Sequence, residues 1–291
     1  MILYILYRIG YFIANAIPVK VSYGLGCLVA NAHYYFSAKD RSAVLNNLRV
    51  IDNGRHDEKE LRPMAREVFG NFAKYLVDFF RFHKIDQEYI NKFIKIDGLE
   101  NLDKGLSGGK GVIVLSAHMG NWELGGFIMS LLRNPLSAVV LTHKNKRIND
   151  FFRRQRTISK LKPVEIGMSL RSCYNVLKTN GLLALLGDRD FSNRGLYINF
   201  FGKKTLIPKG PAAFSCRMGS CIVPTFMIRE KDDTFRLIME PPIYPDTRQE
   251  EKESIKVLVD KYSGVIESYV RKYPTQWYMF REVWNGNAKT L

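Results

Sequence analysis

A histidine and a glutamate, His118 and Glu123, stand five positions apart in the segment AHMGNWE. A histidine whose ring nitrogen is held by a carboxylate can remove the proton from a hydroxyl group. Gly120 and Asn121 lie between the two, and we expect free backbone N–H groups there, which can stabilise an oxyanion. The same spacing also occurs by chance, and the alternative is a core histidine beside a helix cap. The pair predicts acid–base chemistry on a hydroxyl, with that structural alternative left open.

The elements around this pair would place it in a cleft. Residues 111–116 form an apolar run that predicts a short buried strand, and a helix is expected to begin near Trp122. Glu123 falls in the first turn of that helix, where the helix dipole favours a carboxylate. In α/β sheets, ligands collect at the carboxyl ends of the strands. We therefore expect His118 at the mouth of such a sheet.

The rest of the chain predicts strands that alternate with helices. Further strands are expected at 137–141, 182–186, 221–228 and 235–239, and helices at 57–82, 147–160, 169–181 and 247–272. The stretch around Pro163 is expected to be a loop, and residues 200–213 a loop that leads into a helix. This alternation predicts an α/β fold, a single layered domain with a mostly parallel central sheet flanked by helices.

The first 36 residues are mostly apolar and aromatic, with only Arg8 and Lys20 charged. A spanning helix needs roughly 20 apolar residues, and the first run is short and ends at Pro18. We expect two helices, 2–17 and 20–36, that lie on or dip into one bilayer leaflet. The alternative is that both are core helices. Positive residues after this segment would keep the domain that follows on the cytoplasmic side.

The formal charge of +16 and the pI of about 9.6 predict an anionic partner. Nucleic acid, an anionic membrane surface and an acidic carrier protein all qualify. No nucleic-acid-binding signature accompanies the charge, so we expect no nucleic-acid partner. The four cysteines lack metal-binding spacing, so we expect them to be core residues in a reducing compartment, and we expect no metal site.

Six motifs run along the chain in a fixed order: AHMGNWE at 117–123, GDRD at 187–190, FFG at 200–202, PKGPAAFS at 208–215, IVP at 222–224 and YPTQWYMFREVW at 273–284. With them the chain resembles the lauroyl/myristoyl acyltransferases of lipid A biosynthesis. That family is a branch of the lysophospholipid acyltransferase superfamily, which includes phosphatidylinositol mannoside acyltransferases. Lipid A enzymes commonly have a histidine where Phe280 stands, and this departure suits the wider glycolipid branch equally well.

The resemblance implies a glycerolipid acyltransferase-like fold, with residues 1–36 as a membrane-associating segment and 37–291 as the acyltransferase domain. It implies an O-acyltransferase at the cytoplasmic face of the inner membrane. The enzyme would move a fatty acyl group from acyl carrier protein or acyl-coenzyme A to a hydroxyl of a glycolipid, first of all a lipid A precursor, without a cofactor. The alternatives are a phosphatidylinositol mannoside or other lysolipid acyltransferase, and a non-catalytic membrane-surface protein on the same fold.

The resemblance also implies catalytic roles for individual residues. His118 would be the general base, and Glu123 or Asp188 would orient it and stabilise the imidazolium that forms. Asp188 comes directly after a predicted buried strand, as an acid does in similar enzymes, whereas Asp190 is expected to be structural. An Asp-x-Asp sequence also resembles the metal-binding motif of sugar-nucleotide glycosyltransferases, which is a third possible function.

A basic segment at 144–162 contains a single acid, Asp150, and most of it is expected to face solvent. The resemblance implies that one arginine of this helix lies near the active centre. We expect it to be Arg156, with Arg153 or Arg154 as alternatives, because a guanidinium suits an anionic oxygen. The residues expected to bind substrate are Gly120, Asn121, Arg156 and Arg189.

Overall fold

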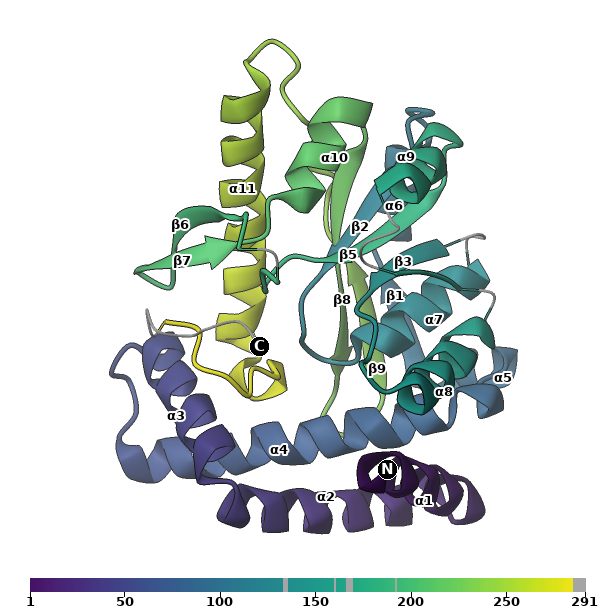
Figure 1. The fold of residues 1–291 in the computed structure, drawn as a ribbon, viewed down its shortest axis with the longest axis vertical. Coiled ribbons are helices and arrows are strands. Elements are labelled where there is room, and N and C mark those ends of the chain that lie inside the picture. Colours follow the sequence, from purple (N-terminus) through teal and green to yellow (C-terminus); the bar gives the residue numbers. More distant parts are fainter. Residues whose placement is uncertain (133–135, 160, 166–169, 192, 285–291) are drawn as a thin grey trace.

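A computed structural model describes residues 1–132, 136–159, 161–165, 170–191 and 193–284 (Figure 1). At its centre lies a seven-stranded sheet in the order β1-β9-β8-β2-β5-β3-β4. The strands are β1 (Ile94–Asp97), β2 (Val112–Ser116), β3 (Leu136–Val140), β4 (Lys162–Glu165), β5 (Leu182–Leu186), β8 (Cys221–Arg229) and β9 (Phe235–Met239). Those from β8 to β4 run parallel, whereas β9 is antiparallel to β8 and parallel to β1. The predicted α/β fold with a mostly parallel sheet is confirmed.

The register of β2 and β5 determines the relative positions of His118 and Asp188. Ser116, the last residue of β2, pairs with Leu186, the last residue of β5. His118 and Asp188 each follow two positions later, so they leave the sheet side by side at its carboxyl edge. Because ligands bind at this edge of parallel sheets, the register itself marks the site.

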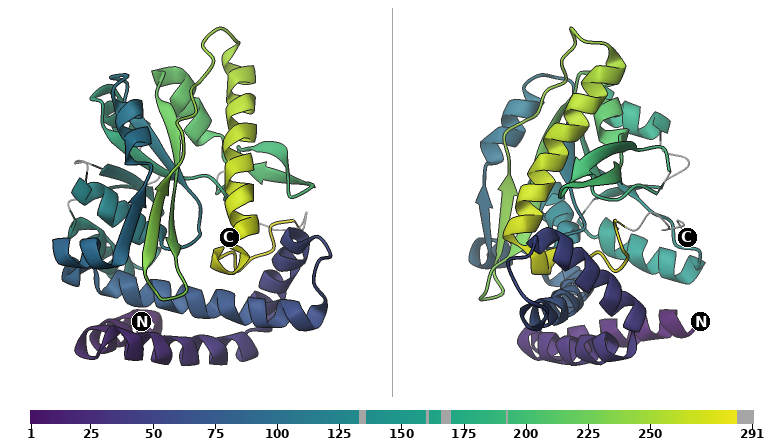
Figure 2. Two further views of the ribbon diagram at one scale, coloured as in Figure 1. Left: turned by 180° about the vertical axis from the view of Figure 1, so that it is seen from behind. Right: turned by 90° about the vertical axis from the view of Figure 1, so that its left-hand side faces the viewer.

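Helices cover both faces of the sheet (Figure 2). On one face, the side chains of Val112 and Val114 join a core with α6 (Leu99–Leu106), α7 (Trp122–Leu132) and α8 (Lys146–Thr157). On the other, Ile113 and Leu115 join a core with α9 (Leu170–Lys178), α10 (Gly210–Met218) and α11 (Glu251–Lys272). Successive strand residues point to opposite faces, which explains this division. A strand buried on both faces reads as a continuous apolar run, as β2 does.

Two segments expected to be loops are strands instead. Pro163 lies in β4, at the edge of the sheet, where the N–H that proline lacks has no partner strand to bond. β6 (Leu196–Phe200) and β7 (Lys203–Ile207) form an antiparallel hairpin. Phe201 and Gly202 close it with φ of 55° and 75°, the left-handed conformation that two-residue hairpin turns require. The predicted cap Ser169 lies outside the described residues.

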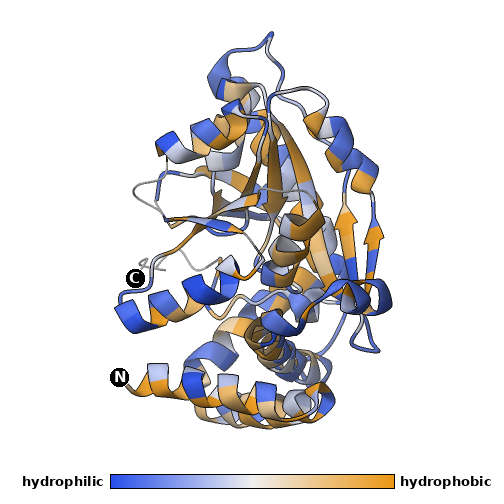
Figure 3. Ribbon diagram, turned by 90° about the vertical axis from the view of Figure 1, so that its right-hand side faces the viewer, coloured by the Kyte–Doolittle hydropathy of each residue, from blue (hydrophilic) through white to orange (hydrophobic). Residues whose placement is uncertain are grey.

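The first four helices form one end of the molecule (Figure 1). They are α1 (Ile2–Ala16), α2 (Val19–Phe36), α3 (Ala38–Asp52) and α4 (Glu58–Phe80), and the shorter α5 (Gln87–Phe93) follows. α1 fully buries only Ala14, so it is a surface helix rather than a core helix. Exposed apolar side chains on α1 and α2 include Ile2, Leu3, Leu6, Phe12, Leu28 and Val29, and the ribbon near the N-terminus is orange along much of its length in Figure 3. No helix in the described part of the chain is both long and apolar enough to cross a bilayer.

Candidate active site

His118 and Asp188 form a hydrogen-bonded pair at the carboxyl edge of the sheet. The Nδ1 atom of His118 lies 2.9 Å from Oδ1 of Asp188, and the backbone N–H of His118 donates to Oδ2 at 2.9 Å. The indole Nε1–H of Trp277 donates to the same Oδ2, also at 2.9 Å. Both carboxylate oxygens are therefore hydrogen-bonded, and among the described residues nothing is hydrogen-bonded to Nε2 of the imidazole, the nitrogen that can meet a reacting group.

The Asp188 side chain is fully buried, whereas 19% of the His118 side chain is exposed. Burial alone would raise the pKa of Asp188. Attraction to His118 and the hydrogen bonds from His118 and Trp277 outweigh burial and hold that pKa below its usual range. An ionised Asp188 fixes the ring orientation and favours the imidazolium form once His118 accepts a proton.

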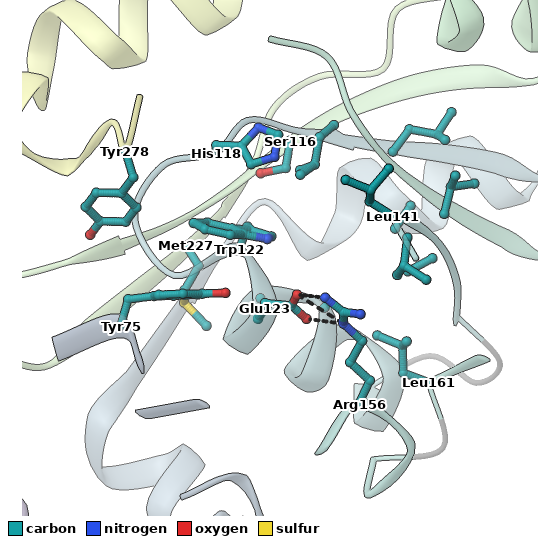
Figure 4. A pocket seen from close by; sticks show the side chains of 18 of the residues that line it. Tyr75, Ser116, His118, Trp122, Glu123, Leu141, Arg156, Leu161, Met227 and Tyr278 are labelled. Carbon is teal, nitrogen blue, oxygen red and sulfur yellow. Dashed lines mark hydrogen bonds and ion pairs between the residues drawn. The ribbon is translucent and has the colours of Figure 1, made fainter. Parts of the chain in front are cut away.

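Glu123 does not orient the histidine, so that part of the sequence prediction is wrong. Its carboxylate accepts from Nε of Arg156 at 3.1 and 3.0 Å and from Nη2 at 2.5 Å. In Figure 4 the indole of Trp122 lies between the His118 ring and this ion pair. The reason is the start of α7: Trp122 stacks on Tyr75 with 4.4 Å between ring centroids, and Glu123, one position on, points to α8.

The ion pair is nearly enclosed, with 10% of the Glu123 side chain and 13% of the Arg156 side chain exposed. Burial alone would lower the pKa of Arg156, but Glu123 outweighs it and raises that pKa above its usual value. Arg156 is thus the arginine of α8 that turns inward, as expected, and the alternatives Arg153 and Arg154 are exposed.

The turn at Gly120 and Asn121 offers no free donors, contrary to expectation. The Gly120 N–H donates to the carbonyl of Gln276 at 2.8 Å, and the Asn121 N–H to that of Met227 at 2.7 Å. The Asn121 side chain is buried and bonds to Asp78. Gly120 has a φ of 57°, and a Cβ there would collide with the Met227 carbonyl, so glycine is required for packing. These two residues shape the turn and are not among the residues that line the neighbouring cavity.

A cavity of about 490 Å³ opens beside His118. His118, Trp122, Glu123, Arg156 and Arg189 line its polar end. Most of the remaining wall is apolar, and it includes Met129, Leu136, Ala138, Val140, Leu161, Ala184 and Leu186 from the sheet, a neighbouring helix and the segment just before β4. Tyr7 of α1 and Leu76 of α4 also line it, so the cavity reaches the N-terminal helices. A cavity of this shape can take an apolar chain with its reactive head at His118.

Three residues of the C-terminal motif that border the candidate site were not identified from the sequence: Trp277, Tyr278 and Arg281. Trp277 bonds to Asp188, and the Tyr278 N–H donates to the His118 carbonyl at 2.8 Å. Arg281 lines the cavity with Tyr278. Their concentration in one aromatic motif at 273–284 is the sequence signal that could have found them.

The Asp-x-Asp pair has no metal-binding arrangement in the structure. Both carboxylate oxygens of Asp188 are hydrogen-bonded to His118 or Trp277. Within the described ranges, no group of three or more histidine, cysteine or acidic side chains is placed to hold a metal ion. All four cysteines are free thiols, with Cys173 and Cys221 buried.

The chain matches the family described as bacterial lipid A biosynthesis acyltransferase over residues 1–285. It is 23% identical over 286 residues to a phosphatidylinositol mannoside acyltransferase of Mycolicibacterium smegmatis, covering 96% of this chain and 90% of that protein. A phosphatidylinositol mannoside acyltransferase of Mycobacterium tuberculosis is 23% identical over 229 residues, covering 76% and 70%. A lipid A biosynthesis palmitoleoyltransferase of Escherichia coli is 24% identical over 251 residues, covering 84% and 81%. All three names state acyl transfer, whereas the lipids they name differ.

Proposed function

The chain belongs to the bacterial lipid A biosynthesis acyltransferase family, and from that premise we propose that it transfers a fatty acyl group from a thioester donor to a hydroxyl of a membrane glycolipid. It is an acyltransferase, as its family and relatives are. The observation that carries the finer proposal is the His118–Asp188 pair at the head of a largely apolar cavity. His118, a base that can accept a hydroxyl proton, lies where the thioester end of a bound acyl chain would be.

The neutral imidazole of His118 accepts the proton of the acceptor hydroxyl at Nε2, while Nδ1–H stays bonded to Asp188. The hydroxyl oxygen bonds to the thioester carbonyl carbon, whose oxygen becomes an oxyanion. Collapse of this intermediate breaks the carbon–sulfur bond, and the imidazolium returns its proton to the thiolate. A thioester is already activated, so the proposal requires neither a covalent enzyme intermediate nor a metal.

The oxyanion needs a donor other than the N–H groups of Gly120 and Asn121, because both are engaged in backbone hydrogen bonds. Arg156 is the proposed donor, because its charge lies in the cavity and Glu123 fixes its plane through Nε and Nη2. Its Nη1 makes no hydrogen bond within the described part of the chain, which leaves the two N–H groups of that atom for the substrate oxygen. Preorganised charge of this kind, shielded from water, is an effective means of oxyanion stabilisation.

The basic surface suits either thioester donor. Lys144, Lys146, Arg147, Arg153 and Arg154 lie on or just before α8, beside the cavity wall formed by that helix. Acyl carrier protein is acidic and would dock here by charge complementarity, whereas coenzyme A carries phosphates. Competition by purified acyl carrier protein against acyl-coenzyme A discriminates between the donors.

Membrane association is part of the same proposal. The exposed apolar side chains of α1 and α2 form a surface that can insert into one leaflet, at the cytoplasmic face of the inner membrane. Because Tyr7 of α1 lines the cavity, the helix that carries part of this surface also borders the cavity, which would give a lipid acceptor a short path to His118.

A lipid A precursor is the first candidate acceptor, and a phosphatidylinositol mannoside is the second. The family description supports the first candidate. The second is supported by the mycolicibacterial relative, whose sequence match covers 96% of this chain. Mass spectrometry of lipids from cells that lack and then regain the protein tests both. One glycolipid should lose and recover a single fatty acyl mass, and an unchanged lipid profile together with no thioester hydrolysis by the purified protein would instead indicate a non-catalytic membrane-surface protein.

A further inference from the structure

Two arginines from distant parts of the chain lie against one aromatic ring near the candidate base. The guanidinium carbon of Arg189 is 4.4 Å from the centroid of the Phe191 ring, and that of Arg281 is 6.0 Å from it. The same ring packs edge-on against His118, with 6.4 Å between centroids. Arg189 and Arg281 both line the cavity. Two positive charges are thus held against an aromatic ring that itself packs against His118.

Neither arginine has the partner that a partly buried charge normally needs. In the described ranges, no hydrogen bond or ion pair joins either guanidinium to an acidic side chain, and the Nε atom of each is buried without a hydrogen-bond partner. Both oxygens of the adjacent Asp188 accept hydrogen bonds from His118 or Trp277. Burial lowers the pKa of Arg281 and outweighs the attraction of Asp188 and Asp190, so these two acids do not fully compensate its charge. Burial, followed by repulsion from Arg281, lowers the pKa of Arg189 to about 10. Stacking on Phe191 offsets part of the cost but supplies no negative charge.

An anion between the two guanidiniums would remove this imbalance. A guanidinium offers parallel N–H donors in a fixed plane, which match two oxygens of a phosphate group. Glu123 cannot act as this anion, because its carboxylate forms an ion pair with Arg156. We propose that Arg189 and Arg281 bind a phosphate group of a substrate and thereby fix its position relative to His118.

The proposal rests on the proposed function for the identity of the substrates, and a phosphate can come from either. The 4′-phosphopantetheine arm shared by acyl carrier protein and coenzyme A carries one at the end of the pantetheine unit opposite to the thioester. A phospholipid or phosphoglycolipid acceptor carries one in its headgroup. In both cases the bound phosphate would anchor the flexible reactant, so that the reacting atom meets His118 in a narrow range of orientations.

Binding, rather than turnover, gives the direct test, so failure of the acyl-transfer proposal would not conceal the result. Calorimetry at low salt would measure the binding of inorganic phosphate to the protein. It would also compare the binding of 4′-phosphopantetheine with that of pantetheine, and the binding of dihexanoylphosphatidic acid with that of dihexanoylglycerol. The protein should bind inorganic phosphate and prefer the phosphorylated member of one pair, which identifies the source. The variant Arg189→Gln/Arg281→Gln should weaken phosphate binding by about 10- to 100-fold, as expected for the loss of charged hydrogen bonds.

The control variant Arg217→Gln/Arg248→Gln removes two guanidiniums near the ends of α10 and α11, outside the cavity, and should change phosphate binding less than about twofold. Arg281→Lys keeps the charge without the planar donors and should give an intermediate affinity, which guards against a folding defect in the double variant. Equal weakening in the control variant, unchanged phosphate affinity in the double variant, or no preference for phosphate in either ligand pair would overturn the proposal.

Discussion

Removal of either partner of the Glu123–Arg156 ion pair should destabilise the fold, and removal of both should restore it. The carboxylate receives three hydrogen-bond contacts from one guanidinium, and the two side chains are only 10% and 13% exposed. Breaking such a pair leaves an uncompensated charge in a nearly dry site, which costs about 3–5 kcal/mol. Replacing both groups by apolar side chains of similar volume is often close to neutral.

Urea unfolding followed by far-UV circular dichroism measures these effects. We expect Glu123→Leu and Arg156→Met each to lower the free energy of unfolding by about 3–5 kcal/mol, and the double variant to lie within about 1 kcal/mol of the natural protein. All three should transfer little acyl group, because the oriented guanidinium is absent in each. Residual transfer by Glu123→Leu should keep the acid limb of its pH–rate profile, because Glu123 does not contact His118.

The reverse pattern would show that Glu123 is not a structural partner of Arg156 alone. A Glu123→Leu protein that unfolds like the natural one, yet shows a displaced acid limb, would mean that the glutamate acts through the histidine during catalysis. Asp188→Asn provides the comparison, because its acid limb is expected to move.

Further predictions concern the same site and its surroundings. Asp188→Asn should lower the rate of acyl transfer by about 10²-fold or more, because His118 loses the ion that stabilises its protonated form. The folded-state pKa of Asp188 is lowered, so its ionisation stabilises the fold above about pH 4 and this stability is lost as the pH falls through the folded-state pKa; thermal unfolding of Asp188→Asn should therefore depend less on pH below that point. Phe12→Ser/Leu28→Ser should reduce sedimentation with anionic vesicles without a change in unfolding temperature, since the two side chains are 71% and 66% exposed. Ala138→Leu should shift the preferred donor toward shorter acyl chains, measured by competition among thioesters, because Ala138 lines the apolar wall of the cavity.

The sequence predicted the central strand, its turn and the helix that follows, because each has a strong local signal. An apolar run predicted β2, and the position of His118 after it was enough to place the histidine at the sheet edge. The paired ends of β2 and β5 then explain why Asp188 lies beside it. The hairpin β6–β7 had a usable signal as well, since residues 196–207 alternate on either side of the FG turn.

The partners of individual side chains could not be predicted in the same way. Glu123 is close to His118 in sequence, and that proximity suggested a direct contact. The helix start instead turns the carboxylate toward Arg156, which lies 33 positions away on α8. The same limit applies to Trp277, whose hydrogen bond to Asp188 spans 89 positions. Such contacts depend on how helices pack on the sheet, which local patterns do not specify.

Acyl transfer by the His118→Ala protein is the most direct test of the central claim, that this imidazole removes the hydroxyl proton. The assay would follow purified protein, a labelled acyl thioester and a glycolipid acceptor in vesicles, with far-UV circular dichroism and vesicle binding measured on the same preparation. We predict a loss of turnover of about 10²-fold or more, with secondary structure and vesicle binding unchanged. Turnover near that of the natural protein would contradict the account.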